Sequence, residues 1–236
     1  MATENIMQTR KKKSDGIRRM VITAMLSAIT ALLTFTPLGM IPLPPPLPAV
    51  TLVHIPVILA VLVESLSVGL TVGLVFGLCS LIRAWETAQV GLTLFFRNPM
   101  VSVFPRLLIP LVAYLMYQLW KKYTPKNQVM DKLGVSVAAA VGAVTNTVCC
   151  LGMLLLIYET DLRQLLQGMA QAGNLDVAYT ENVAAWLFSV VGLSNGIAEA
   201  IVAAVLIPVL KTAVEAVNRR TGRKPNSKKE NRGESA

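Results

Sequence analysis

The residues best suited to chemistry in this chain are polar side chains set within or beside long apolar runs. They are Arg97, Asn98, Arg106, Asn146, Asn195, Glu199 and the single histidine, His54. Polar groups at such depth in a membrane are costly, so they usually face the interior of a helix bundle or a wet cavity. A guanidinium binds a carboxylate or phosphate through two parallel hydrogen bonds. The set therefore predicts a binding site for a small polar ligand and favours an anionic or amide-bearing one.

Structural roles compete with this interpretation. Asn146 and Asn195 could simply hydrogen-bond between helices, and Arg106 and Glu199 could form a structural ion pair. A lone histidine such as His54 is more often a hydrogen-bonded structural residue than a ligand contact. A further alternative concerns the aromatic side chains expected near the outer boundary, which would form an interfacial belt or, for one or two of them, cap a pocket. These are Trp85, Tyr158, Tyr179 and Trp186.

Motifs for catalysis or cofactor binding are missing from the sequence. One histidine without a cluster of cysteines or carboxylates cannot make a metal site, so we expect neither a metal nor a cofactor. There is no P-loop, no H-E-x-x-H and no nucleophile elbow, so no catalytic residue is assigned and an enzyme is not expected. The three cysteines, Cys79, Cys149 and Cys150, lie in apolar runs and are interpreted as small core residues.

The composition is that of a membrane protein. Of 236 residues, 54% are hydrophobic, and the mean hydropathy is +0.58. Only 15% are charged, against about 25% in ordinary soluble domains. Several apolar stretches exceed the length of about 18 residues that a helix needs to cross a bilayer. The sequence therefore predicts an all-α polytopic membrane protein with six transmembrane helices in one bundle.

The 22 lysines and arginines are distributed unevenly along the chain. They crowd the N-terminus, one polar connector at 121–132 and the segment from Lys211 onward, and the four exceptions are Arg83, Arg97, Arg106 and Arg163. Cytoplasmic segments carry the excess of basic residues, so both termini are expected in the cytoplasm. The net charge of +9 then reflects orientation and attraction to anionic inner-leaflet lipids, and nucleic acid is not an expected partner.

The apolar runs divide the chain into a basic N-terminal segment (1–16), a membrane domain (17–212) and a basic disordered tail (213–236). Within the membrane domain the expected spans are 17–35, 51–63, 68–83, 99–120, 133–158 and 182–210. Outer loops are expected at the proline-rich segment 42–48, at 85–98, which is interpreted as partly re-entrant, and at the polar segment 159–181. Proline lacks a backbone donor and fixes its own backbone, so 42–48 cannot be a helix.

Small residues at four-residue spacing allow helix backbones to approach closely. Ala24 and Ala28 form A-x-x-x-A on the first span, with Ala31 on the same face. The third span carries a double G-x-x-x-G, at Gly69, Gly73 and Gly77. These residues either pack within the chain or dock the helices of a partner, and both alternatives stay open at this point.

Together these features resemble the substrate-specific (S) components of energy-coupling factor (ECF) transporters, the ABC-type vitamin importers of bacteria. The resemblance covers about residues 17–212. It rests on the basic inner ends, the small-residue spacing on the first and third spans, and the proline-rich first loop. Three further motifs support it: His54-Ile55-Pro56, Asn98-Pro99 with Pro105-Arg106, and the asparagine in the middle of each of the last two spans.

The resemblance implies a multi-pass protein of the bacterial cell membrane that binds a small water-soluble vitamin near the outer face. It implies that Ala24 and Ala28 contact a transmembrane coupling subunit and that two separate ATPase subunits supply the energy. The arginines favour pantothenate, which carries a carboxylate, as the cargo, with riboflavin or cobalamin as the alternatives. A stand-alone secondary transporter, and a membrane enzyme or assembly factor, are the competing classes.

Overall fold

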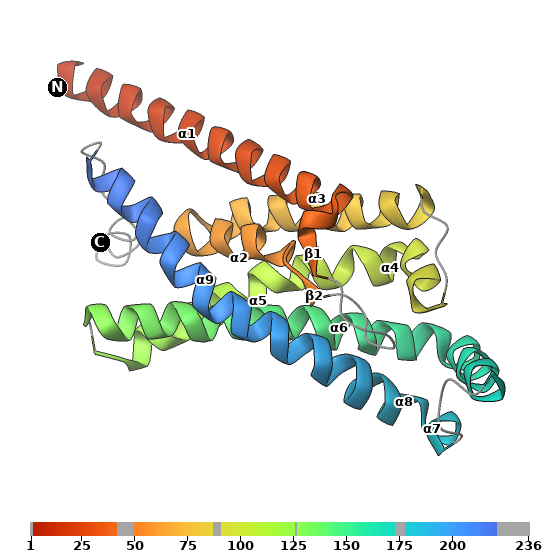
Figure 1. The fold of residues 1–236 in the computed structure, drawn as a ribbon. Coiled ribbons are helices and arrows are strands. Elements are labelled where there is room, and N and C mark those ends of the chain that lie inside the picture. The colour runs from red at the N-terminus through yellow and green to blue at the C-terminus, as the bar shows by residue number, and fades with distance from the viewer. Residues whose placement is uncertain (1, 42–49, 87–90, 126, 173–177, 221–236) are drawn as a thin grey trace.

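The computed structural model describes residues 2–41, 50–86, 91–125, 127–172 and 178–220 (Figure 1). Almost all of them are helical, which confirms the all-α prediction. The α-helices are α1 (Ala2–Phe35), α2 (His54–Val63), α3 (Leu66–Glu86), α4 (Pro99–Ser102), α5 (Phe104–Tyr123), α6 (Gln128–Gln171), α7 (Ala178–Glu181), α8 (Val183–Trp186) and α9 (Leu193–Arg220). Short 3-10 helices, η1 (Pro37–Gly39) and η2 (Gly91–Arg97), and a π-helix, η3 (Leu187–Gly192), complete the helical segments. Strands β1 (Met40–Ile41) and β2 (Val50–Thr51) pair antiparallel, with Met40 opposite Thr51.

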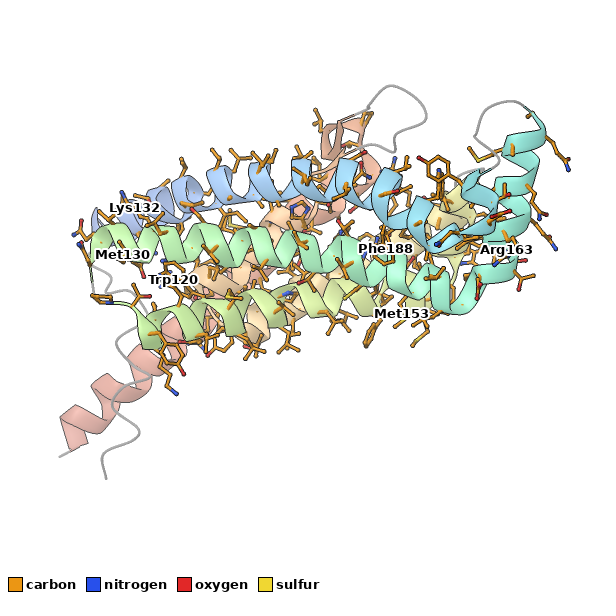
Figure 2. The ribbon with its side chains drawn as sticks, turned by 90° about the horizontal axis from the view of Figure 1, so that it is seen from below. Trp120, Met130, Lys132, Met153, Arg163 and Phe188 are labelled. Carbon is orange, nitrogen blue, oxygen red and sulfur yellow. The ribbon has the colours of Figure 1, made fainter. Side chains whose placement is uncertain are left out.

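The long helices run roughly side by side and alternate in direction, so the bundle has two distinct ends (Figure 1). The start of α1 and the end of α9 lie at the same end, which also holds Trp120 and Lys132; we call it the basic end (Figures 1 and 2). The opposite end, called the far end, holds α4, α7, α8 and the labelled residue Arg163, whereas the strand pair lies between the two ends, where α1 finishes (Figures 1 and 2).

Five of the six predicted spans are confirmed as helices long and apolar enough to cross a membrane. The remaining one, α2, is a helix of 10 residues. At a rise of about 1.5 Å per residue it covers roughly half of a hydrocarbon core. Its residues from His54 to Leu62 are almost all buried, because α1, α3, α5 and α9 pack around it. A short helix is tolerated here because protein, not lipid, surrounds it.

Glycines on α3 let it lie directly against α2 and α5. A Cβ atom added at Gly69 would lie 2.6 Å from the Cβ of Val61, and one added at Gly73 would lie 2.8 Å from the carbonyl oxygen of Arg106. The same addition at Gly77 would lie 2.8 Å from the Cα of Val103. All three glycines are buried, so they pack within the chain. The prediction that they dock a partner is therefore corrected, because their face is already covered.

The first helix presents the opposite case. Its apolar part, Gly16–Phe35, is the least buried of the candidate spans, at 6%. Ala24 and Ala28 are exposed, and Ala31 is half-buried. The small residues of α1 therefore remain available to a partner helix. The helix also begins at Ala2, so the basic segment expected before the first span is helical.

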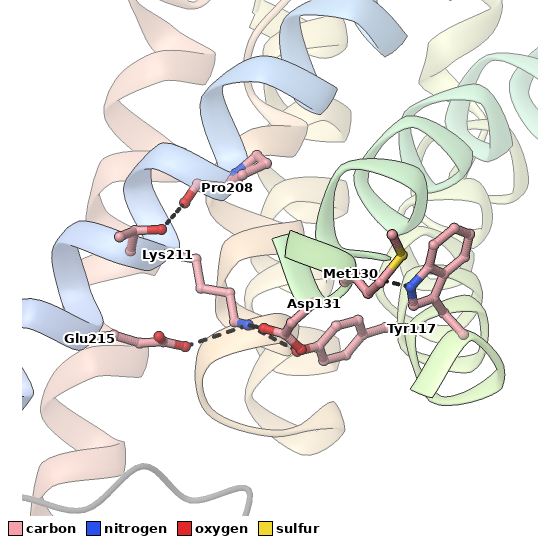
Figure 3. A network of polar contacts seen from close by, with 8 residues as sticks. Tyr117, Met130, Asp131, Pro208, Lys211 and Glu215 are labelled. Atoms are coloured by element: carbon pink, nitrogen blue, oxygen red, sulfur yellow. Dashed lines mark hydrogen bonds and ion pairs between the residues drawn. The ribbon is translucent and has the colours of Figure 1, made fainter. Parts of the chain in front are cut away.

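Polar contacts tie the helices together at the basic end. Arg18 of α1 forms an ion pair of 2.8 Å with Glu64, which follows α2, and donates to the side-chain oxygen of Asn218 on α9 at 3.3 Å. In a second cluster, the Nζ of Lys211 lies 2.9 Å from the hydroxyl of Tyr117 and 3.2 Å from Oδ2 of Asp131 (Figure 3). These two clusters connect α1, the α2–α3 turn, α5, α6 and α9.

Three segment predictions are corrected at the ends of the helices. The outer loop expected at 159–181 is helical as far as Gln171, because α6 continues beyond a kink at Tyr158 (φ −126°, ψ 28°). The segment after the kink buries Leu162 and Leu166 completely, and this burial explains why it folds as helix. The loop expected at 85–98 contains η2, and the helix α9 extends into the segment predicted as a tail. The proline-rich segment 42–48 lies outside the described residues.

We predict that Gly73→Ala destabilises the protein by about 1–3 kcal/mol, the usual cost of overpacking, because its methyl group would meet the Arg106 carbonyl. Unfolding by SDS in mixed micelles measures the change. Gly152→Ala is the matched control, since nothing lies within 4 Å of an added Cβ there and alanine is the better helix former. Equal stability of the two variants would contradict the close approach of α3 to α5.

Candidate functional site

Arg106 lies in the first turn of α5, just after the chain bends between α4 and α5. Asn98 starts α4 as its N-cap: its Oδ1 accepts from the backbone N–H of Met100 at 2.9 Å, and Pro99 follows at a position where no donor is needed. The helix ends at Val103, and α5 begins at Phe104 with Pro105 in its first turn. This break explains how an arginine near the start of a span is turned into the bundle.

The guanidinium of Arg106 is buried, with 6% exposure, and is held on several sides. Its Nη1 donates to the carbonyl oxygen of Val101 at 2.7 Å and to the Sγ of Cys150 at 2.9 Å. The rings of Phe76 and Phe96 lie 5.3 and 5.1 Å from its central carbon. Its Nε has no hydrogen-bond partner among the residues that the structure describes. A cation fixed in this way, with a free donor, is suited to receiving an anion.

Glu199 of α9 is the buried carboxylate of the site, with 3% exposure. Its Oε1 accepts from the backbone N–H of Thr51 at 2.9 Å and from the Thr51 hydroxyl at 2.6 Å. Its Oε2 accepts from the hydroxyl of Thr147 on α6 at 3.3 Å. The carboxylate therefore joins β2, α6 and α9. The alternative of an Arg106–Glu199 ion pair is wrong, because each side chain binds the other partners named here.

His54 begins α2 and is completely buried. It lies within electrostatic range of Glu199 and close to the backbone of Thr51, yet neither ring nitrogen completes a hydrogen bond. Asn195, one turn before Glu199 on α9, has a buried Oδ1 without a partner. The prediction that His54 is held by a structural hydrogen bond is therefore not met within the described residues.

Asn146 and Cys150 lie one turn apart on α6 and are both buried. The Cys150 thiol lies 3.6 Å from the Oδ1 of Asn146 and 2.9 Å from the Nη1 of Arg106. This contact links the side chain of Asn146 to Arg106 on α5. The structure thus brings Arg106 and Asn146 together through a cysteine that the sequence analysis assigned only to the core.

Arg97 and Asn98 lie at the rim of this region. The Nε of Arg97 donates to the carbonyl oxygen of Ala84 at 3.0 Å, and its guanidinium lies 5.3 Å from the ring of Trp85. The Nδ2 of Asn98 donates to the hydroxyl of Tyr158 at 3.1 Å, at the kink of α6. Both side chains have partners within the chain, so their role as ligand contacts stays a prediction.

Sequence reasoning missed the two threonines that bind Glu199 and misjudged the burial of Trp186. Thr51 and Thr147 bind Glu199. The one available signal for Thr147 was its position directly after Asn146 in the sequence, and Thr51 had no such signal. Trp186 was expected mainly in an interfacial belt, but it is 4% exposed and its indole nitrogen has no partner within the described part of the chain. Its position directly before the last long apolar run was the available signal.

Comparison with known proteins agrees with this architecture. A family model described as "ECF transporter, substrate-specific component" matches residues 18–211. The chain is also 27% identical over 212 residues to the pantothenate transporter PanT of Leuconostoc mesenteroides subsp. mesenteroides, a match that covers 89% of this chain and 98% of that protein.

We predict that Glu199→Ala lowers the free energy of unfolding by about 1–3 kcal/mol without ligand, because it removes the charged acceptor of three hydrogen bonds, two of them from the half-buried Thr51. Glu199→Gln keeps an oxygen acceptor and loses less. SDS titration in mixed micelles measures both, and Glu159→Ala serves as the control because that carboxylate is 63% exposed. Wild-type stability of Glu199→Ala would show that the carboxylate does not hold β2.

Proposed function

The chain belongs to the family of substrate-specific components of ECF transporters, and from this premise we propose that it is the vitamin-binding subunit of an importer of pantothenate. In this proposal the vitamin binds among α2, α5, α6 and α9, in the half of the bundle toward the far end. A coupling subunit and two ATPase subunits, all separate chains, then drive its release into the cell.

The observation that carries the proposal is a set of buried polar atoms that lack partners within the described residues. They are both ring nitrogens of His54, Nε of Arg106, Nε1 of Trp186 and Oδ1 of Asn195. Each such atom costs about 1–3 kcal/mol when left unpaired, and native proteins contain few of them. A bound polar ligand would supply the missing partners. Because the set contains both donors and acceptors, it suits a ligand that carries both kinds of group.

Pantothenate fits this set by its chemistry. It carries one carboxylate, which matches the free donor of Arg106, and an amide with two hydroxyl groups, which match His54 and Asn195. A flavin would need aromatic faces for stacking, but Phe76 and Phe96 already face the Arg106 guanidinium. The name of the Leuconostoc relative supports the same cargo.

The distribution of charge supports an orientation for the proposed subunit. Lys132 lies at the basic end (Figure 2), Lys121 and Lys122 directly follow Trp120 there, and Arg18 contacts Asn218 near the end of α9; the proposal places this end in the cytoplasm of a bacterial cell. The far end then faces outward, where the vitamin arrives. The exposed small residues of α1, Ala24 and Ala28, face the surrounding membrane and would receive a helix of the coupling subunit.

We predict that Arg106→Gln weakens binding of pantothenate by about 1.5–3 kcal/mol, the value of a hydrogen bond to a charged group. Isothermal titration calorimetry in detergent would compare pantothenate with its alcohol analogue, in which a hydroxymethyl group replaces the carboxylate. The variant should bind the alcohol almost as the wild type does, because that ligand has no charge to lose.

Arg163→Gln is the matched control, since Arg163 is exposed and pairs only with Glu159 among the described residues. If Arg106→Gln lost equal affinity for the acid and for the alcohol, Arg106 would not be the residue that binds the carboxylate. Failure of the wild-type protein to bind pantothenate, with an empty site verified by mass spectrometry, would refute the proposed cargo.

We also predict that Ala24→Trp and Ala28→Trp leave pantothenate binding unchanged but abolish uptake, because a bulky side chain blocks close helix approach. Calorimetry measures the first property, and uptake of labelled pantothenate into proteoliposomes containing the whole transporter measures the second. Val148→Trp, on an exposed face of α6, is the control and should transport normally. Loss of binding in the α1 variants would contradict the separation of docking face from site.

A further inference from the structure

Trp186 is a buried side chain whose polar atom has no use within the described structure. It is the last residue of α8, it is 4% exposed, and its indole Nε1 lacks a hydrogen-bond acceptor. A buried indole N–H usually finds a partner, because leaving it unpaired costs free energy. Trp186 belongs to an apolar cluster that includes Leu154, Leu162 and Leu187, and the side chains of these leucines carry no hydrogen-bond acceptor.

The backbone around Trp186 holds the indole in place. Asn182 caps α8, its Oδ1 accepting from the N–H of Ala185 at 3.0 Å. The π-helix η3 follows immediately, and such helices are frequent at functional sites. At its end, a Cβ atom added to Gly192 would lie 3.1 Å from Leu151 of α6, so this segment is pressed against α6.

The apolar cluster around Trp186 extends to the Arg106 site. Val101 is a member of the cluster, and its carbonyl oxygen accepts from Arg106 at 2.7 Å. Phe96, whose ring lies 5.1 Å from the Arg106 guanidinium, packs against the same cluster. The indole and the guanidinium therefore border one apolar region, and each contributes a buried donor without a partner.

We propose that Trp186 is a specificity-determining residue that donates its indole N–H to a neutral oxygen of the bound vitamin, an amide or hydroxyl oxygen, while Arg106 receives the carboxylate. This inference rests on the proposed function of vitamin binding. In this arrangement two donors bind different parts of the ligand. The Arg106 cation binds the carboxylate, and the neutral N–H of Trp186 binds the part that pantothenate and its alcohol analogue have in common.

The test is Trp186→Phe, which removes the N–H and keeps an aromatic ring. Calorimetry should show affinity reduced roughly 3- to 10-fold, the value of one neutral hydrogen bond, and by the same factor for pantothenate and its alcohol analogue. Arg106→Gln is expected to give a different result, because it should weaken the binding of pantothenate and leave the binding of the alcohol analogue almost unchanged. Thermal unfolding without ligand should be unchanged or shifted upward, because the substitution removes an unpaired buried donor.

The tryptophan content provides a second readout and matched controls. The chain has 3 tryptophans, and Trp120 lies at the basic end, where its Nε1 donates to the carbonyl oxygen of Met130 (Figure 2). Trp85 is 64% exposed at the end of α3. In the double variant Trp85→Phe/Trp120→Phe, emission comes from Trp186 alone and should shift when pantothenate is added. Trp120→Phe by itself should bind with wild-type affinity.

Different results would overturn different statements. If Trp186→Phe binds both ligands as tightly as the wild type, and the emission of Trp186 does not shift when either ligand is added, the indole does not contact the vitamin. If the variant unfolds at a lower temperature without ligand and loses affinity in proportion, Trp186 only supports packing. If the wild-type protein binds no vitamin, the proposed function fails and this inference falls with it.

Discussion

Lipid hydrocarbon offers no hydrogen-bond partner, so a polar group inside this bundle must find one within the protein or its ligand. Most of the described buried groups obey that constraint locally. The hydroxyls of Thr30, Thr34 and Thr145 each donate to the carbonyl oxygen four residues earlier on their own helix, at 2.7–2.8 Å. Glu199 accepts three hydrogen bonds from two threonines. Against this background, the five buried atoms without a partner among the described residues stand out as candidate contacts for the proposed ligand.

The same packing that closes the bundle also sets the position of Arg106. Gly73 on α3 allows the Arg106 backbone to approach, since a Cβ there would lie 2.8 Å from the Arg106 carbonyl oxygen. Phe76, one turn later on α3, then lies beside the guanidinium. The glycine spacing of α3 thus positions Arg106 within the bundle, while Ala24 and Ala28 of α1, which pack little within the chain, remain exposed.

Much of the architecture could be predicted from sequence because membrane spans are long and the basic residues are sorted by side. The polar set was also visible, since residues such as Arg106 and Asn146 interrupt apolar runs. The contacts between these side chains could not be predicted, because they join segments that are distant in the sequence. Thr51 and Glu199, for example, are 148 residues apart. The kink at Tyr158 and the π-helix were equally hidden, since burial of Leu162 and the register against α6 decide them.

The contact between Thr51 and Glu199 also has a consequence for biosynthesis. The chain leaves the ribosome from its N-terminus, so β2 and the short helix α2 enter the membrane long before α9 is made. Until then the N–H of Thr51 lacks its carboxylate acceptor, and the side of α2 that faces α9 has no neighbour. Synthesis of α9 therefore completes the surroundings of β2 and α2, and a truncated chain that lacks α9 would present quality-control proteases with an unfinished bundle.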